Sequence, residues 1–312
     1  MTSREVEHEI VIDAPAEQVY RMIAEVENWP LIFPPSVYVD YVERGADHER
    51  IRIWATANGE AKNWTSRRVL EPAARRITFR QETPAPPVAS MGGTWIVAPR
   101  TDTTSHVRLL HDYRAIDDAP ASLEWIDKAV DRNSRAELAA LKHNVELATG
   151  VAELTLSFTD SVEVNGSPKD LYDFINEAGA WRERLPHVGS VDLREATPGL
   201  QVLRMDTLTK DGSRHTTESI RVCFPHHRIV YKQTTLPALM DLHTGYWQFT
   251  EEDSGVTTAT SQHTVVINPD KIAGVLGAGS TVDDARKFVR DALGGNSRAT
   301  LEHAKAYAEA RR

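Results

Sequence analysis

Hydrophobic and polar residues alternate along most of the chain, and helical spacing replaces this alternation in two stretches of each half. Residues 5–13 alternate as a half-buried strand does. Residues 17–26 follow an Asp-Ala-Pro helix start, present apolar side chains on one helix face and end at Trp29-Pro30. Alternating segments between turn residues predict strands near residues 37–43, 48–58, 61–71, 75–82, 91–98 and 104–113. Residues 121–148 carry one apolar stripe and predict a long amphipathic helix.

The same order of elements occurs twice along the chain. Phe79-Arg80-Gln81 in the first half matches Tyr231-Lys232-Gln233 in the second, and Ser66-x-Arg68 matches Ser219-x-Arg221. Further matching pairs at nearly constant spacing are Trp29 and Trp181, Gly93 and Gly245, Trp95 and Trp247, and His111 and His263. A repeat of this length is too long for a solenoid, so each copy predicts a domain of its own. The predicted domains are residues 1–150 and residues 151–312.

Each copy predicts an α+β fold, in which a curved antiparallel sheet wraps around the long C-terminal helix. The apolar stripe of that helix can be buried only against the concave face of the sheet, because no other layer is predicted. A strongly curved sheet that closes over one helix leaves an interior cavity. We expect a ligand to bind in that cavity.

Composition and charge exclude several classes of function. The 312 residues carry 36 basic and 45 acidic side chains, and the net charge of −9 argues against a general nucleic-acid binder. No apolar run reaches the roughly eighteen residues of a membrane span, and the N-terminus is charged where a signal peptide is apolar. We therefore expect a cytoplasmic protein with no membrane segment.

The sequence also lacks the short motifs of several enzyme classes. The lone Cys223 leaves no disulfide framework and no cysteine zinc site, and a buried structural thiol is the simplest interpretation of it. There is no dinucleotide-binding glycine loop, no HExxH metal motif and no GxSxG nucleophile elbow. We predict no metal and no cofactor.

One strand carries residues suited to a polar pocket lining. Period-two geometry places Trp64, Ser66 and Arg68 on the same face of the strand near residues 61–71. The structural alternative is that Arg68 faces solvent and pairs with a surface carboxylate. Ser-x-Arg recurs in the second copy, which suggests that both copies require these residues for the same reason. That reason can be structural or chemical.

A histidine occupies an inward position on the last strand of each copy. His111 lies on a mostly apolar face of the strand near residues 104–113, and His263 recurs at the matching place. A lone inward histidine is usually a hydrogen-bonded core residue. If it is buried near Arg68, its neutral form is favoured and it could exchange a proton near neutral pH. Trp29, Phe79 and Trp95 are core aromatics or walls of the cavity.

These features together resemble the didomain aromatase/cyclases of bacterial type II polyketide synthases, over essentially the whole chain. The resemblance is carried by Trp29, the strand Trp64-Thr65-Ser66-Arg67-Arg68, Gly93-x-Trp95, His111 and the helix segment Asn133-Ser134-Arg135-Ala136. It implies a START-like helix-grip fold in each half. It also implies action on a poly-β-ketone that is bound to an acyl carrier protein, beside a ketosynthase and a ketoreductase.

The resemblance further implies a reaction and roles for residues. In a ketoreduced chain, the first ring closes between carbons seven and twelve by an aldol reaction and is then dehydrated to an aromatic ring. Arg68 is the implied catalytic residue, because a fixed guanidinium stabilises an oxyanion. Ser66 would orient a water or a carbonyl, and His111 would move protons. The expected substrate-binding residues are Trp29, Tyr38, Trp64, Phe79 and Trp95.

The second copy supplies a parallel set of candidates. Ser219, Arg221 and His263 repeat the polar residues of the first copy, whereas Thr217 replaces Trp64. We therefore expect cyclisation in the first copy, with the second copy acting as a scaffold, as a dehydration site or as a degenerate pocket.

Two other functions fit the same sequence. A cavity fold also suits a non-catalytic carrier or chaperone of a hydrophobic ligand, because fold does not determine function. A carrier predicts that replacing Arg68 lowers affinity at most. A structural assembly factor for a synthase complex predicts instead that pocket changes are harmless and that surface changes are not.

Overall fold

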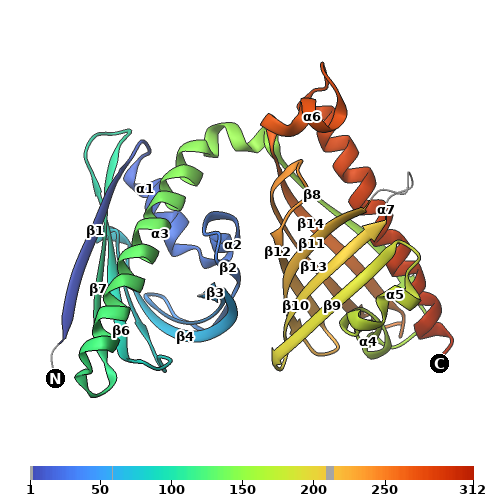
Figure 1. Cartoon of the computed structure of the whole chain (residues 1–312), viewed down its shortest axis with the longest axis horizontal. Coiled ribbons are helices and arrows are strands. Elements are labelled where there is room, and N and C mark those ends of the chain that lie inside the picture. The colour runs from blue at the N-terminus through green and yellow to red at the C-terminus, as the bar shows by residue number, and fades with distance from the viewer. Residues whose placement is uncertain (1–2, 58, 209–213) are drawn as a thin grey trace. The chain divides into compact units, whose positions relative to one another are not determined.

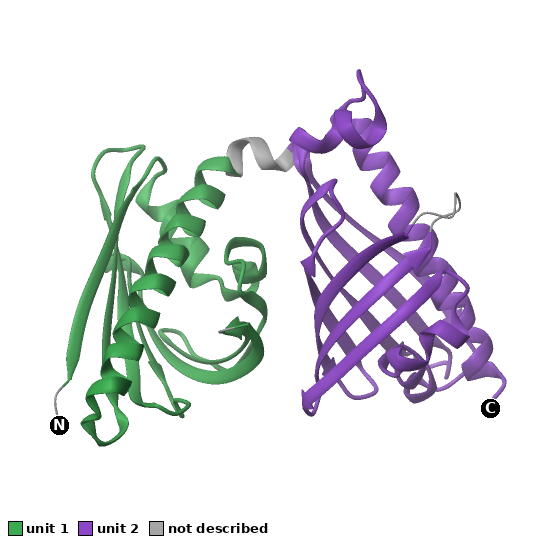
Figure 2. Ribbon diagram, viewed as in Figure 1, with its two compact units in different colours: residues 1–149 green, residues 150–312 purple. Residues whose placement is uncertain are grey.

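The computed structural model describes residues 3–57, 59–208 and 214–312, and the chain forms two compact units, residues 1–149 and residues 150–312 (Figures 1 and 2). In the described ranges, each unit is a seven-stranded antiparallel sheet followed by a long helix. The predicted α+β architecture of two tandem domains, each with an antiparallel sheet and a long C-terminal helix, is confirmed.

The first unit begins with a strand that closes against the last strand of the same unit. Its elements are β1 (Arg4–Ile12), α1 (Ala16–Ala24), α2 (Trp29–Ile32), β2 (Ser36–Arg44), β3 (His48–Ala57), β4 (Glu60–Glu71), β5 (Arg76–Gln81), β6 (Val88–Pro99), β7 (Ser105–Ala115) and α3 (Pro120–Leu154). Each strand from β2 to β7 pairs with the next along the chain, and β1 pairs with β7. The two short helices, α1 and α2, form the connection between β1 and β2, which are the two edge strands of the sheet.

The second unit repeats this order with one additional short helix before its long helix. Its elements are β8 (Thr155–Val164), α4 (Pro168–Asn176), α5 (Trp181–Arg184), β9 (Val188–Thr197), β10 (Leu200–Leu208), β11 (Arg214–Phe224), β12 (Arg228–Thr235), β13 (Met240–Glu251), β14 (Thr257–Ile267), α6 (Ile272–Leu276) and α7 (Val282–Glu309). The strand order, β8-β14-β13-β12-β11-β10-β9, is that of the first unit. The duplication in the sequence is therefore a duplication of topology.

Local sequence signals account for the ends of the helices. Thr281 and Asp284 form a reciprocal capping box, which pairs backbone donors at the start of α7. Ser167 caps α4 by accepting a hydrogen bond from the backbone of Asp170. The predicted helix over residues 121–148 continues to Leu154 as α3. The last residue of the predicted strand 48–58 lies outside the described residues.

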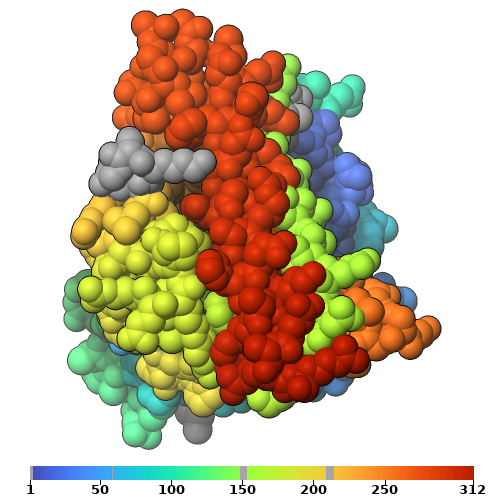
Figure 3. Space-filling model, turned by 90° about the vertical axis from the view of Figure 1, so that its right-hand side faces the viewer, coloured from blue at the N-terminus to red at the C-terminus, as the bar shows by residue number. Residues whose placement is uncertain are grey.

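Each long helix buries its apolar stripe against the concave face of its own sheet. In the first unit, Leu138, Leu141 and Val145 of α3 pack in one core cluster with Val107 and Leu109 of β7, among others. In the second unit, α7 packs on β8, β14 and α4, and Figure 3 shows α7 running along the surface of the unit beside α4 and α5. Among the described residues, no helix is long and apolar enough to cross a membrane.

Candidate functional site

The residues that recur in the sequence form a row across four neighbouring strands. In the first unit, Arg68 on β4 pairs with Phe79 on β5, Phe79 with Gly93 on β6, and Gly93 with His111 on β7. Directly opposed residues of antiparallel strands share a face of the sheet. The arginine, the aromatic ring, the glycine and the histidine therefore lie side by side on the face that α3 covers.

The second unit contains the same row with one change of chemistry. Arg221 on β11 pairs with Tyr231 on β12, Tyr231 with Gly245 on β13, and Gly245 with His263 on β14. A tyrosine thus stands where the first unit has Phe79. The glycine leaves room for that ring, because a Cβ atom at Gly245 would meet the Tyr231 hydroxyl and the backbone carbonyl of Gln262.

Both terminal nitrogens of Arg68 are hydrogen-bonded within its own unit. Its side chain is 2% exposed, and its Nη1 donates to Oε2 of Glu49 at 3.1 Å. Its Nη2 donates to the carbonyl oxygens of Ile23 and Ala24, each at 3.1 Å. These carbonyls belong to the last turn of α1, where no further helical N–H can pair with them. The guanidinium also lies over the ring of Trp29, so Arg68 ties α1 to the sheet.

Arg221 is equally buried but has fewer partners. Its Nη2 donates to the carbonyl oxygen of Ile175 at 2.7 Å, and its guanidinium lies over Trp181. Across the strand, Gln201 occupies the place that Glu49 holds in the first unit. Within the described part of the chain, no carboxylate forms an ion pair with Arg221, and its buried Nη1 has no hydrogen-bond partner. Burial lowers the pKa of Arg221 from its ordinary value.

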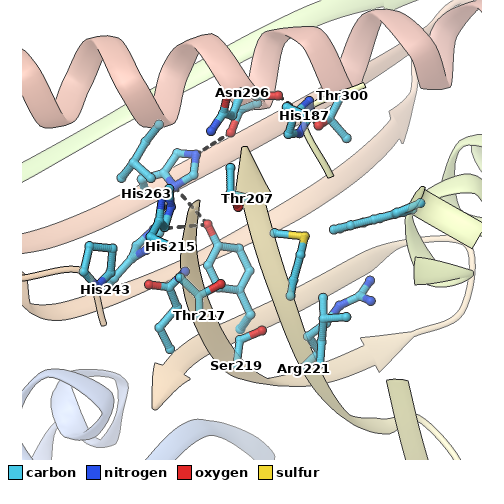
Figure 4. Close-up of a pocket in the computed structure, with 18 of the residues that line it drawn as sticks. His187, Thr207, His215, Thr217, Ser219, Arg221, His243, His263, Asn296 and Thr300 are labelled. Carbon is cyan, nitrogen blue, oxygen red and sulfur yellow. Dashed lines mark hydrogen bonds between the residues drawn. The ribbon is translucent and has the colours of Figure 1, made fainter. Parts of the chain in front are cut away.

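A cavity of about 130 Å³ lies between the sheet and α7 of the second unit (Figure 4). The polar residues of the recurring row that line it are Arg221, Tyr231 and His263. Figure 4 shows Ser219 and Arg221 at one end of the cavity, His187, Asn296 and Thr300 at the other, and His243 and His263 along one side. The unpaired donor of Arg221 therefore belongs to a side chain that lines a space able to hold a ligand.

The repeated Asn-Ser-Arg-Ala segment of each long helix supplies a serine to the histidine. Ser134 of α3 lies 3.3 Å from Nδ1 of His111, and Ser297 of α7 lies 2.7 Å from Nε2 of His263. Burial lowers the pKa of both histidines to about 4, so both rings are neutral near pH 7. The rings of Phe79 and His111 lie in an edge-to-face arrangement, with 5.6 Å between their centroids.

The structure places most of the predicted first-unit residues on one face. Trp64 packs in a cluster with Ile53, and Ser66 is buried beside it on the same strand face as Arg68. Trp95 is 7% exposed and packs in the core under α3.

Two predicted wall residues have contacts that the sequence did not indicate. Trp29 donates its indole N–H to the carbonyl oxygen of Ile23 at 3.1 Å, which fixes the ring beside Arg68. Tyr38 lies on the opposite face of the sheet from Ser66 and Arg68. It pairs with Trp54, whereas the inward residue of this strand is its neighbour Val39, which packs with Ile53. Successive strand residues point to opposite faces, so Tyr38 is removed from the substrate-binding set.

Sequence reasoning missed three residues that define the second site. Tyr231 was visible only as the partner of Phe79 in the repeat, and His243 stands where the first copy has Met91. Gln201 replaces Glu49. The available signal was the set of positions at which the two copies differ in polarity. The residues that the copies share give them the same fold, and the residues that differ give their interiors different polar groups.

The fold defines a class of tandem proteins in which, in each unit, a curved antiparallel sheet packs around a long helix, and the second unit contains a cavity lined by apolar and polar side chains. Comparison with known proteins narrows this class. Residues 3–146 and residues 155–309 each match the family described as "Polyketide cyclase / dehydrase and lipid transport". The chain therefore belongs to the polyketide cyclase/dehydrase family.

Relatives of similar length carry more specific names. The chain is 51% identical to a granaticin polyketide synthase bifunctional cyclase/dehydratase of Streptomyces virginiae, over 96% of this chain and 98% of that one. It is 46% identical to the actinorhodin polyketide synthase bifunctional cyclase/dehydratase of Streptomyces coelicolor, over 98% of each. Among solved structures, the di-domain ARO/CYC BexL of the BE-7585A pathway is 69% identical, with a TM-score of 0.92 over 99% of this chain and all of that one.

Proposed function

We propose that this protein closes the first ring of a ketoreduced poly-β-ketone between carbons seven and twelve and dehydrates that ring to an aromatic product. The names of the full-length relatives, which are bifunctional cyclase/dehydratases of polyketide synthases, support this proposal. The substrate would arrive on an acyl carrier protein, after a ketosynthase and a ketoreductase have acted. Aldol closure and loss of water require only proton transfers and oxyanion stabilisation, so the proposal includes no metal and no redox cofactor.

The observation that carries the proposal is that Arg221 lines the second-unit cavity and has a buried donor, Nη1, without a partner among the described residues. Ring closure needs an enolate at one carbon and a polarised ketone at the other, and both place negative charge on oxygen. A buried guanidinium stabilises such an oxygen strongly, because water screens its charge little. Arg221 would hold the oxyanion through Nη1, while Ile175 and Trp181 fix the rest of the group.

Cavity size supports a one-ring step. An engineered cavity of roughly 150 Å³ in another protein holds benzene, so the cavity of about 130 Å³ has the volume of a single six-membered ring. Holding two carbons of a flexible chain in such a space raises their effective concentration and selects which of them react. The remaining chain would extend towards the carrier protein.

This assignment changes the role proposed for the first unit. Glu49 and the end of α1 already accept hydrogen bonds from both terminal nitrogens of Arg68, so we propose Arg68 as a positioning residue. The prediction that Ser66, Arg68 and His111 carry the chemistry stays a prediction, and the same experiment tests it.

Product analysis by liquid chromatography and mass spectrometry tests the proposed function. A minimal polyketide synthase with its ketoreductase would be run alone, with the protein, and with the Arg221→Met or the Arg68→Met variant. We expect the protein to convert a mixture of shunt products into one closed ring, and Arg221→Met to lower that yield about 100-fold, the loss typical of an oxyanion donor. Arg204→Met, at an exposed position on β10, is the matched control and should act as wild type.

The other outcomes are equally informative. If Arg68→Met, corrected for the amount of folded protein, abolishes closure and Arg221→Met does not, the first unit is the active one. If adding the protein leaves the product mixture unchanged, the enzyme proposal fails for this substrate class, and a carrier explains the cavity better.

A further inference from the structure

Three buried side chains of the second unit form one hydrogen-bonded cluster, which we name the Tyr231 cluster: Tyr231, His243 and His263. The Tyr231 hydroxyl lies 2.9 Å from Nδ1 of His263 and 3.4 Å from Nε2 of His243. The two imidazoles are joined by a separation of 2.9 Å between His243 Nε2 and His263 Nδ1. All three residues line the cavity that contains Arg221. A connected set of groups that can pass a proton therefore borders the space where the substrate would bind.

The contacts of the cluster determine which nitrogen carries each proton. Nδ1 of His243 is buried without a partner in the described part of the chain. A buried N–H without a partner is rarer and costlier than an unused acceptor, so the proton of His243 belongs on Nε2 and points to His263. The single lone pair of His263 Nδ1 then lies within hydrogen-bond distance of two donors, His243 Nε2 and the Tyr231 hydroxyl, each at 2.9 Å. The proton on Nε2 of His263 faces the hydroxyls of Ser297 at 2.7 Å and Ser261 at 3.1 Å. Nδ1 of His263 is the proton acceptor of the cluster.

The first unit cannot form this cluster. Phe79 and Met91 occupy the places of Tyr231 and His243, so the first unit has neither a phenol nor a second imidazole at these places, and His111 lies beside the Phe79 ring. Gly245 is the second requirement in the second unit, because a side chain there would overlap the Tyr231 hydroxyl. The ability to relay a proton is thus confined to one of the two copies.

Resting on the proposed function, we infer that Tyr231, backed by His263, performs both proton transfers of the dehydration step in the second unit. First, the phenol oxygen takes the proton from the carbon next to the ketone, and the phenol's own proton moves to Nδ1 of His263. The electron pair of the broken C–H bond becomes the enolate, whose oxygen Arg221 holds. Next, the enolate re-forms the ketone and a C=C bond while the C–O bond of the hydroxyl breaks. Tyr231 protonates the departing hydroxide to give water, and His263 returns its proton to Tyr231.

The environment keeps the cluster in the required starting state. Burial raises the pKa of Tyr231 and lowers the pKa of His263 to about 4, while burial and the neighbouring His263 ring hold the pKa of His243 well below its ordinary value. All three groups are therefore neutral near pH 7, and Nδ1 of His263 keeps its lone pair. Because one hydroxyl serves both transfers, the hydrogen and the hydroxyl must leave from the same side of the ring, which is a syn elimination.

A small probe isolates dehydration from ring closure. β-Hydroxycyclohexanone fits the cavity volume, and loss of water gives cyclohexenone, whose conjugated carbonyl is followed by absorbance. We expect the full-length protein to dehydrate the probe, and Tyr231→Phe to lower kcat at least about 100-fold with KM changed less than about twofold. Tyr246→Phe removes a hydroxyl from the same unit outside the cavity lining and is the control. Phenylalanine is the natural residue at the matching place in the first unit, so Tyr231→Phe should fold.

Two further measurements separate a chemical role from a structural one. With deuterium on the α-carbon cis to the hydroxyl, wild type should release the label, and retention of the label would overturn the inference. His263→Gln can still accept a hydrogen bond from Tyr231 but cannot take its proton, and should also lose dehydration. The inference would also be overturned if Tyr231→Phe dehydrated the probe at the wild-type rate. It would equally be overturned if the wild-type protein did not dehydrate the probe. If dehydration depends on Tyr231 but the synthase assay shows no ring closure, only the closure proposal fails.

Discussion

Two arginines at matching positions differ because of one residue across the strand. Arg68 faces Glu49, whereas Arg221 faces Gln201. A buried ion pair gains little net stability, but removing one partner leaves an uncompensated charge and is strongly destabilising. The carboxylate of Glu49 thus gives the Arg68 guanidinium a buried ion-pair partner, which the Arg221 guanidinium lacks among the described residues.

The first prediction follows from this difference. Arg68→Met should lower the free energy of unfolding by about 3–5 kcal/mol, because it removes the buried partner of Glu49 and leaves that carboxylate only the exposed Arg44, whose Nε lies 3.8 Å from Glu49 Oε1. The double variant with Glu49→Leu should recover at least about 2 kcal/mol of that loss. Urea-induced unfolding followed by tryptophan fluorescence measures both.

Arg221→Met is the matched comparison. No carboxylate among the described residues pairs with Arg221, so this variant removes a buried charge and should leave stability unchanged or raise it. Equal destabilisation by the two substitutions would contradict the structural assignment of Arg68.

At the scale of elements, the sheet register explains why two glycines recur. A Cβ atom at Gly93 would overlap the Phe79 ring and the carbonyl of Leu110, and a Cβ atom at Gly245 would overlap the Tyr231 hydroxyl and the carbonyl of Gln262. In both units the aromatic ring leans over the glycine of the neighbouring strand towards the histidine beyond it. The glycine is therefore part of the geometry that joins the aromatic residue to the histidine.

The second prediction tests this geometry. Gly93→Ala and Gly245→Ala should each cost about 1–3 kcal/mol of stability, because the added methyl group forces the strands and the ring apart. Only Gly245→Ala should also lose dehydration of β-hydroxycyclohexanone, since only Tyr231 carries a hydroxyl to misplace. Unfolding curves and the absorbance assay, run on both variants, measure the two effects. Retained dehydration in Gly245→Ala would show that the position of Tyr231 is not required.

The sequence predicted the elements well because alternation and helical spacing are local properties. It placed Trp64, Ser66 and Arg68 on one face because side chains alternate strictly within a strand. The family resemblance suggests Tyr38 as a pocket residue without regard to strand phase, and Tyr38 lies on the other face. Glu49 could not be recognised as the partner of Arg68, because that pairing depends on the register between two strands.

At the scale of the molecule, duplication followed by divergence produced two sheets of the same topology with different interiors. One interior contains an ion pair, Glu49–Arg68, and a ring without a hydroxyl. The other contains an unpaired guanidinium, a tyrosine and a second histidine around a cavity. Buried polar groups without full satisfaction cost stability, so their retention in one copy is expected where they serve a ligand.

The last prediction converts the second interior into the first. Gln201→Glu would place a carboxylate opposite Arg221, as Glu49 stands opposite Arg68. Glu195 accepts a hydrogen bond from Gln201 at 2.8 Å and would repel the new carboxylate, so the substitution is combined with Glu195→Gln. With the unpaired donor neutralised, we expect ring closure to fall at least about tenfold while stability stays equal or rises, because the buried charge gains a partner.

Product analysis and urea unfolding on the same preparation measure this exchange of activity for stability. The reverse substitution, Glu49→Gln in the first unit, is the control and should cost stability without changing the product, since that unit would gain an unpaired arginine but no proton relay. If the second-unit variant closes the ring at the wild-type rate, a free guanidinium at Arg221 is not what the reaction uses. In that case the asymmetry between the two interiors would reflect packing, and the search for the oxyanion donor would move to the other polar side chains of the cavity.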